Sequence, residues 1–220
     1  MCLQELKATP DQIPQSLAAL DGYTSHWHGE RAYSGVALLV RAALNAAPPV
    51  FSHPPFDFET RMAVVDAGEV VVASVYVPNG GKDFQAKIRF LLSLTEFADQ
   101  MRATGRPFVL CGDLNVTRTD LDVHPKERKT TSIGQLPEER TLLAGLLDRG
   151  LVDLGRALAP DDPELFTWWA PWRNMRARNI GWRIDYVLAS AGLATRATAC
   201  RVQREIGTSD HAPVIAEFSR

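Results

Sequence analysis

The sequence predicts an α/β fold, with either two packed sheets between outer helices or one doubly wound sheet. Several apolar runs lack polar interruptions, as is typical of strands buried on both faces. Segments with helical spacing separate them, and this mixture favours layers of sheet and helix. With 220 residues, 45% of them hydrophobic, the chain can bury one sizeable core, so we expect a single domain over residues 1–220.

The predicted strands are short runs rich in apolar residues. Residues 1–3 resemble the end of a buried strand, and further runs cover residues 35–40, 69–77, 108–111, 184–188 and 213–218. After the run 108–111, Gly112 predicts a sharp turn. That turn would leave Asp113 and Asn115 at the carboxyl edge of the sheet, where α/β proteins usually bind ligands. Taken alone, Asp-x-Asn after a strand is more often a capped turn than an active site.

Two helices are predicted between these strands. Between residues 84 and 101, apolar residues repeat at three- and four-residue spacing, and Gly105 follows as a C-cap. A second helix begins near Pro137 and ends at Gly150. Its leucines at positions 142, 143, 146 and 147 form one apolar stripe.

Composition gives no sign of a membrane protein, a secreted protein or a disulfide-rich protein. The net charge of −2 gives no general preference for nucleic acid, so a phosphate-binding face requires local clustering. The sequence contains neither an apolar stretch of membrane-spanning length nor a secretory signal pattern. Three widely spaced cysteines, Cys2, Cys111 and Cys200, indicate no disulfide framework, which favours a reducing cytoplasmic compartment.

Five short polar segments lie at the ends of the predicted strands. They are Gln4-Glu5, residues 76–81, Asp113 with Asn115, Asp185, and Ser209-Asp210-His211. If the strands run side by side, Glu5, Asp113, Asp185 and Asp210 place four carboxylates in one cleft. Such like charges repel unless a divalent cation neutralises them, and an all-oxygen ligand set fits Mg²⁺ or Mn²⁺ better than zinc.

His211 is the histidine with the clearest functional context. A carboxylate behind its ring would favour the charged form and make it an acid or electrophile toward a phosphate oxygen. The alternative is an exposed turn histidine hydrogen-bonded to Asp210. The other histidines are interpreted as surface or structural residues: His26, His28, His53 and His124.

Tryptophan and arginine are concentrated in residues 168–183. Tryptophan clusters usually belong to a core, but a Trp–Arg mixture in a loop suits stacking on a base or sugar with phosphates alongside. The segment contains Trp168, Trp169, Trp172 and Trp182, interleaved with Arg173, Arg176, Arg178 and Arg183, and Asn174 and Asn179 add neutral donors.

Taken together, these motifs resemble the exonuclease III family of abasic-site endonucleases, within the endonuclease/exonuclease/phosphatase superfamily. The motifs follow the family order from residue 3 to residue 214. They are Leu3-Gln4-Glu5-Leu6-Lys7, residues 33–39, Tyr76-Val77-Pro78-Asn79-Gly80, Gly112-Asp113-Leu114-Asn115 with Thr119-Asp120, Gly181-Trp182-Arg183-Ile184-Asp185-Tyr186 and Ser209-Asp210-His211-Ala212-Pro213.

The resemblance implies a four-layered α/β sandwich, with two mixed sheets packed face to face between helices. It implies Mg²⁺- or Mn²⁺-dependent cleavage of DNA 5′ to abasic sites, removal of nucleotides or blocking groups from 3′ ends, or both. The expected partner is abasic or nicked duplex DNA, with no membrane, and the protein is expected to be a monomer.

The resemblance also implies roles for individual residues. Glu5 would bind the metal and Asp210 would help complete the metal and phosphate site. Asp113 with Asn115 would align and activate water, while His211, oriented by Asp185, would contact the phosphate. Tyr76 would point its hydroxyl at the phosphate or the leaving oxygen. The substrate-binding residues would be Asn79, Lys82, Asn174, Arg176, Asn179, and the pocket walls Trp168 and Trp182.

One departure from the family pattern concerns the N-terminus. Family members carry a strand, with an Asn-x-Asn-like metal-site segment, and a helix before the Leu-Gln-Glu motif, so we expect the fold to be N-terminally truncated. Two alternatives therefore stand beside the nuclease. One is a superfamily phosphatase acting on a small phosphoester, such as an inositol or lipid phosphate. The other is a catalytically weak DNA-binding remnant.

Overall fold

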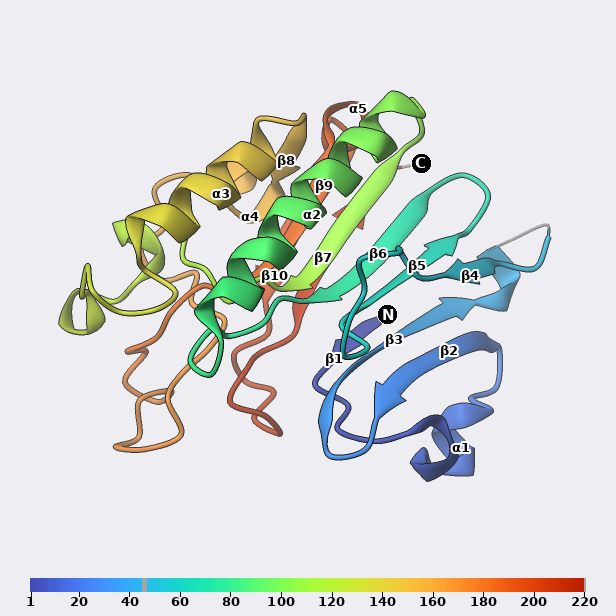
Figure 1. Ribbon diagram of the computed structural model, residues 1–220, viewed down its shortest axis with the longest axis horizontal. Helices are drawn as coiled ribbons and strands as arrows, with labels where there is room; N and C mark the ends of the chain where they lie inside the picture. Colours follow the sequence, from blue (N-terminus) through green and yellow to red (C-terminus); the bar gives the residue numbers. More distant parts are fainter. Residues whose placement is uncertain (45–46, 220) are drawn as a thin grey trace.

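The computed structural model describes residues 1–44 and 47–219. Its largest sheet has six strands in the order β4-β5-β6-β7-β9-β8 (Figure 1). Strands β6 and β7 are parallel, whereas every other neighbouring pair in this sheet is antiparallel. The strands are β4 (Val50–Ser52), β5 (Met62–Asp66), β6 (Val71–Tyr76), β7 (Phe108–Asp113), β8 (Leu151–Asp153) and β9 (Asp185–Ser190).

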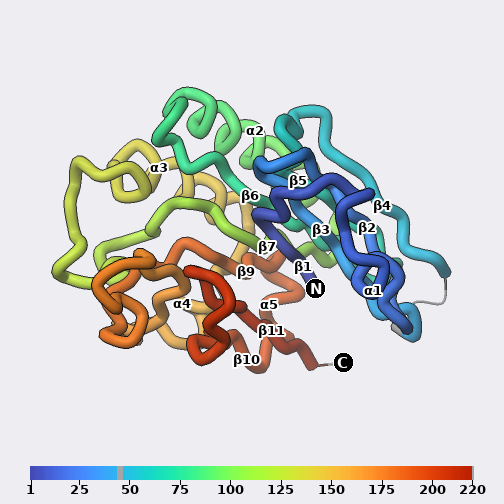
Figure 2. The backbone as a smooth tube through the Cα atoms, turned by 90° about the horizontal axis from the view of Figure 1, so that it is seen from below, coloured from blue at the N-terminus to red at the C-terminus, as the bar shows by residue number. Residues whose placement is uncertain are grey.

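Two smaller antiparallel sheets pack against one face of this sheet. The first has the order β1-β3-β2, with β1 (Cys2–Gln4), β2 (Tyr23–Glu30) and β3 (Tyr33–Arg41). The second pairs β10 (Ala197–Val202) with β11 (Val214–Phe218). Figure 2 shows β1 beside β6 and β7, so the N-terminal strand lies against the centre of the large sheet.

Helices cover the opposite face of the large sheet. The two long ones are α2 (Phe84–Ala103) and α3 (Pro137–Leu147), which lie next to each other (Figure 1). The short helices are α1 (Gln15–Ala18), α4 (Leu154–Leu158), α5 (Ala191–Ala194) and the 3₁₀ turns η1 (Pro10–Gln12), η2 (Ala42–Leu44), η3 (Asp120–Asp122) and η4 (Pro125–Glu127). No helix within the described ranges is long and apolar enough to cross a membrane.

The two faces of the large sheet build separate cores because side chains alternate along each strand. On the face toward the two long helices, Leu110 and Leu188 share one core with Phe90 and Leu94 of α2. The adjacent residues Val109 and Val187 point to the opposite face and pack against β10 and β11. Ala63 and Val65 of β5 instead face Val36 and Leu38 of β3.

The structure confirms the predicted α/β sandwich of mixed sheets flanked by helices. The alternative of one doubly wound sheet is wrong, because smaller sheets rather than helices cover the second face. The predicted strands and both long helices are present. Strands β2, β4, β5, β8 and β10 were not predicted: β2 mixes polar residues on both faces, and β4 and β8 have three residues each.

The sharp turn predicted at Gly112 is also wrong. Gly112 lies within β7 and pairs with Tyr186 of β9, and the chain turns only after Asp113. A glycine is required here for a different reason. Its φ is +137°, and a Cβ at this position would lie 2.0 Å from the Val75 carbonyl oxygen.

We therefore expect Gly112→Ala to destabilise the fold. Backbone strain of this kind costs about 1–3 kcal/mol, and the overlap with Val75 adds to it. The urea unfolding midpoint should fall accordingly. The matched control is Gly145→Ala in α3, where an added Cβ meets nothing within 4 Å and helix propensity predicts a gain of about 0.5–1 kcal/mol. Equal midpoints for the two variants would contradict this explanation.

Candidate active site

The polar segments predicted from the sequence meet at one edge of the large sheet. The strand register places Tyr76 of β6 opposite Asp113 of β7, and Asp113 opposite Asp185 of β9. Glu5 follows β1 directly, and its carboxylate interacts with the Tyr76 hydroxyl and with the charge of His211. His211 precedes β11 and reaches Asp185 from the other side. The fold therefore brings together residues that lie up to 206 positions apart along the chain.

Asp113 and Asn115 form a tight, buried turn at the end of β7. Asn115 has a φ of +52°, in the left-handed region that asparagine tolerates better than most residues. Its backbone N–H donates to Asp113 Oδ1 at 2.8 Å, and its Nδ2 donates to Asp113 Oδ2 at 2.9 Å. Nδ2 also donates to the Val77 carbonyl at 2.9 Å. These bonds hold the Asp113 carboxylate in one orientation.

The environment of Asp113 favours its protonated form. Burial, followed by the negative charges of Asp185 and Glu5, raises the pKa of Asp113 to about 8, although His211 and the Asn115 N–H oppose the rise. Asp113 is only 3% exposed. Near neutral pH this carboxyl group is therefore mostly protonated, and only its ionised form, which a nearby cation would favour, can act as a general base.

His211 is held by Asp185. Its Nδ1 lies 2.9 Å from Asp185 Oδ2, which leaves Nε2 facing away from this pair. Burial on its own would lower the pKa of His211, but the charge and hydrogen bond of Asp185, with help from Asp113 and Asp210, raise it to about 9. The Asp185 backbone N–H is in turn anchored on Thr167 Oγ1 at 3.0 Å. The result is an oriented imidazolium at the edge of the sheet.

Glu5 and Tyr76 lie on the other side of Asp113 from Asp185. Partial burial alone would raise the pKa of Glu5, but hydrogen bonds from Lys7 and Tyr76 and the charges of Lys7 and His211 lower it. The Lys7 ammonium lies 2.7 Å from Glu5 Oε2. Burial, the hydrogen bond to Glu5 and the charges of Glu5 and Asp113 all raise the pKa of Tyr76, so its hydroxyl keeps its proton. Tyr76 is therefore a donor at physiological pH.

These carboxylates suit a hard divalent cation. Glu5, Asp113 and Asp185 offer oxygen donors at one edge, and their mutual repulsion raises the pKa of Asp113, which a bound cation would relieve. The Glu5 side chain is 35% exposed, so one ligand is open to the solvent. Asp210 lies farther out: its Oδ2 accepts a hydrogen bond from Trp168 Nε1 at 2.9 Å. The donor set fits Mg²⁺ or Mn²⁺.

Trp168 and Trp182 lie beside His211. Their rings are 5.6 Å apart at 73°, and the Trp168 ring is 6.5 Å from that of His211. Isolated β-bridges join Trp168 to Trp182 and to His211, so the backbone fixes these positions. Both rings are partly exposed, whereas Trp169 is buried in the core beneath them. The structure thus separates the buried Trp169 from Trp168 and Trp182 beside His211, while Trp172 is exposed to solvent.

Two of the predicted substrate-binding residues are engaged within the protein. Arg176 donates to the carbonyls of Arg204, Ile206 and Ser209 and so anchors the loop before Asp210. Asn179 Oδ1 accepts from Trp169 Nε1 at 3.1 Å, while its Nδ2 has no hydrogen-bond partner among the described residues.

The remaining predicted substrate-binding residues are exposed. Asn79 Nδ2 donates to Asn115 Oδ1 at 3.1 Å, and the Lys82 ammonium lies 6.0 Å from the centre of the Tyr33 ring. Asn174 has a φ of +52° in the tryptophan-rich loop. Asn79 therefore adjoins the Asp113–Asn115 turn, whereas Lys82 and Asn174 contact none of the central residues in the described structure.

Sequence reasoning missed one buried cation beneath the site. Lys87 of α2 is fully buried, pairs with Glu139 of α3, and donates to the backbone carbonyls of Asn115 at 2.7 Å and Asn79 at 3.1 Å. Burial lowers the pKa of Lys87, and the negative charge of Glu139 opposes the fall. The available signal was its spacing, because Lys87 occupies the same apolar stripe as Leu91 and Leu94. Lys87 positions the turn that carries Asn115.

Replacing Lys87 with methionine is expected to destabilise the protein by about 3–5 kcal/mol, because Glu139 would be left as an unpaired buried charge. The double variant Lys87→Met/Glu139→Gln should recover part of this loss. Urea unfolding measures both, with Lys126→Met on an exposed turn as the control. A double variant as unstable as the sum of its two single variants would contradict the pairing.

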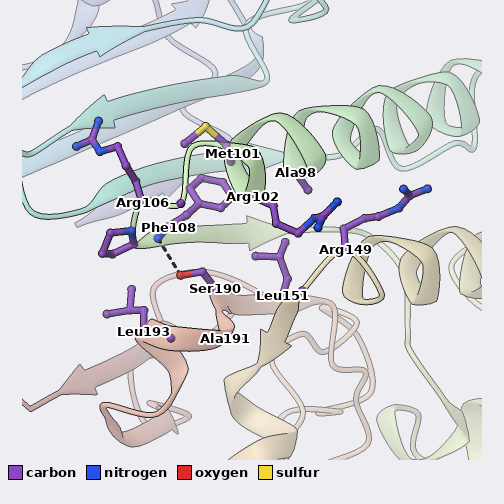
Figure 3. Close-up of a pocket in the computed structure, with 14 residues that line it drawn as sticks. Ala98, Met101, Arg102, Arg106, Phe108, Arg149, Leu151, Ser190, Ala191 and Leu193 are labelled. Carbon is purple, nitrogen blue, oxygen red and sulfur yellow. Dashed lines mark hydrogen bonds between the residues drawn. The ribbon is translucent and has the colours of Figure 1, made fainter.

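A pocket occupies the opposite end of β7 and β9, near Phe108 and Ser190 (Figure 3). The Phe108 N–H donates to Ser190 Oγ at 3.1 Å within it. The arginines at its rim already have acidic partners: Arg106 pairs with Asp66, and Arg102 and Arg149 both pair with Asp99. Since Phe108 and Asp113 are at opposite ends of β7, this pocket is not part of the candidate site.

Comparisons with known proteins show which family the chain resembles. Residues 1–211 match the model of the endonuclease/exonuclease/phosphatase family. The chain is 31% identical to Recombination repair protein 1 of Drosophila melanogaster over 99% of its own length, and spans about a third (32%) of that protein. It is 30% identical to the DNA repair nuclease APEX1 of Danio rerio, covering 97% of this chain and 71% of that protein.

The fold of this chain is also similar to a solved structure. The 3′ phosphatase NExo from Neisseria, bound to a product DNA hairpin, superposes with a TM-score of 0.89. The two chains are 32% identical, and the match covers 100% of this chain and 88% of the Neisseria chain.

Proposed function

The chain belongs to the endonuclease/exonuclease/phosphatase family, and we propose that it is a metal-dependent DNA-repair phosphodiesterase. Its reaction is cleavage of DNA 5′ to abasic sites, removal of nucleotides or blocking groups from 3′ ends, or both. The observation that carries the proposal is the row Tyr76–Asp113–Asp185 across three adjacent strands, flanked by Glu5 and His211. The relatives, named as a DNA repair nuclease and a 3′ phosphatase, support it.

In this proposal Asp113 accepts a proton from the attacking water. A bound cation would counter the repulsion that raises the pKa of Asp113 and so favour the ionised form that accepts the proton, while Asn115 orients the carboxylate and offers a neutral amide beside it. His211, held charged by Asp185, donates through Nε2 to a phosphate oxygen as charge develops there. The Tyr76 hydroxyl, which keeps its proton, donates to the phosphate or the leaving oxygen.

Glu5, with help from Asp210, would hold a Mg²⁺ or Mn²⁺ ion, which when bound stabilises negative charge on the phosphate. Lys7 lies against the Glu5 carboxylate and lowers its pKa, so the ligand stays ionised over the physiological range.

The proposed substrate-binding surface centres on Trp168 and Trp182. Trp168 and Trp182 would form the walls of a pocket for a flipped abasic sugar, since flipping costs least where no base is paired or stacked. Asn79, Lys82 and Asn174 would contact the DNA directly. Arg176 and Asn179 would act by holding the loop and Trp169 beneath the pocket.

We further propose that the enzyme acts as a monomer and as one domain over residues 1–220, because a single chain supplies every group of the row. The three free cysteines accord with a reducing cytoplasmic compartment.

A substrate panel tests the proposal. The full chain would be incubated with Mg²⁺ and an abasic duplex, a 3′-recessed duplex, a duplex with a 3′-phosphate, and a phosphoinositide. We expect turnover of one or more DNA substrates and none of the phosphoinositide. Phosphoinositide hydrolysis without DNA cleavage would favour the small-phosphoester alternative. DNA binding with strong salt dependence but no turnover would favour the DNA-binding remnant.

A further inference from the structure

A second group of metal-ligating side chains lies away from the Asp113 row, where the edges of two sheets meet. His26 and His28 are two residues apart on β2 and therefore share one face of that edge strand. His53 and Asp57 come from the connection between β4 and β5 of the large sheet. One ligand atom each from His28, His53 and Asp57 lie within 4.8 Å of one another.

The orientation of His53 is that of a metal ligand. Its Nδ1 lies 3.2 Å from the Met62 carbonyl oxygen, which can only accept, so Nδ1 carries the proton and Nε2 presents its lone pair. Metal-bound histidines characteristically donate their second ring nitrogen to a carbonyl or carboxylate in this way.

Asp57 is oriented in a similar way. Its Oδ1 accepts the backbone N–H groups of Arg61 at 2.8 Å and Met62 at 2.9 Å. Its Oδ2 is left facing His28 Nε2 at 2.6 Å. One carboxylate oxygen thus secures the loop while the other is directed into the cluster.

His26 completes the group. Its Nε2 lies 3.0 Å from Nε2 of His53, and its ring stacks on Phe51 at 5.0 Å and 15°. Without a cation, one proton must bridge these two ring nitrogens. With a cation, both lone pairs can point at the same centre.

We propose that His28, His53 and Asp57, with His26 as the fourth ligand, bind a divalent transition-metal ion of the Zn²⁺ type. Imidazole nitrogens with one carboxylate suit zinc, in contrast to the all-oxygen set around Asp113. Ligand atoms of a tetrahedral zinc site lie about 3.4 Å apart at bond lengths of about 2.1 Å. The centres of the His28 and His53 rings are 3.7 Å apart, so these two rings would have to turn away from each other to bind one ion. His53 is exposed and gives an ion access, whereas the Asp57 side chain is 7% exposed.

The ion would cross-link the edge strand β2 to the connection between β4 and β5 of the large sheet. Arg61 donates its backbone N–H to Asp57, and its guanidinium lies 4.9 Å from the centre of the Tyr76 ring, so the metal site would also border the Asp113 row. The site is independent of the proposed DNA chemistry, because none of its four ligands belongs to that row.

Zinc binding tests the proposal directly. The full chain, freed of metal and dialysed against Zn²⁺, would be analysed for bound zinc by elemental analysis and for its melting temperature. The key variant is His28→Ala/His53→Ala, with the milder His28→Gln as a second. His124→Ala removes a histidine outside the cluster, and Glu5→Gln/Asp113→Asn removes ligands at the Asp113 row.

We expect one retained equivalent of zinc and a higher melting temperature for the unchanged chain, His124→Ala and Glu5→Gln/Asp113→Asn. The double histidine variant should lose both the zinc and the thermal shift, and His28→Gln should bind zinc more weakly while its metal-free melting temperature stays unchanged. Zinc retained by the double histidine variant, or none bound by the unchanged chain, would overturn the proposal.

Discussion

Replacing Asp113 with asparagine is expected to lower turnover on abasic DNA by at least ~100-fold, the usual effect of losing a general base or an electrostatic group. Asp113 is the buried central member of the row, and its carboxylate, once ionised, is the group placed to accept a proton from water. An asparagine amide cannot accept that proton. The measurement is single-turnover cleavage of an abasic duplex at saturating enzyme.

The control for this variant is Asp66→Asn, the same chemical change at an exposed carboxylate that pairs with Arg106 far from the site. It should cleave at the rate of the unchanged chain. Circular dichroism and unfolding curves establish that both variants are folded. Near-normal cleavage by folded Asp113→Asn would contradict the role assigned to Asp113.

Replacing His211 with alanine is expected to have a similar effect, again at least ~100-fold in turnover. The imidazolium would be lost from the position where phosphate charge develops, while duplex binding should change much less. His124→Ala serves as the matched control, because His124 caps a short 3₁₀ turn by accepting from the Lys126 N–H.

A double variant shows whether Asp185 acts by orienting His211 or contributes to catalysis on its own. If Asp185 acts through His211, His211→Ala/Asp185→Asn should be little slower than His211→Ala alone. Fully multiplicative losses would show that Asp185 acts separately from His211.

Much of this site could be predicted from sequence because its residues lie at the ends of strands with uninterrupted apolar runs. Strand β7 is buried on both faces, so its residues from Phe108 to Leu110 mark the position of Asp113. The same holds for β9 and Asp185. Once those strands are neighbours, register alone places Tyr76, Asp113 and Asp185 in one row.

The features that could not be predicted depend on contacts between distant segments. In the sequence, Lys87 is one polar residue within a helix. Its role follows only from the contacts with Glu139 of α3 and the Asn115 carbonyl. Arg176 has the composition of a phosphate ligand, yet its donors are taken by three carbonyls of the loop 204–209. The cluster of His26, His28, His53 and Asp57 likewise requires the β4–β5 connection to meet β2.

The row around Asp113 and His211 is expected to act as a metal-dependent phosphodiesterase site. The most direct measurement uses a 5′-labelled duplex with one abasic site, incubated with the full chain in Mg²⁺ or in EDTA and resolved on a denaturing gel. We predict shortened labelled strands, from a cut 5′ to the abasic site, from loss of 3′-terminal nucleotides, or from both, that form in Mg²⁺ and not in EDTA. DNA that stays intact in Mg²⁺, or is cut equally in EDTA, would contradict the claim.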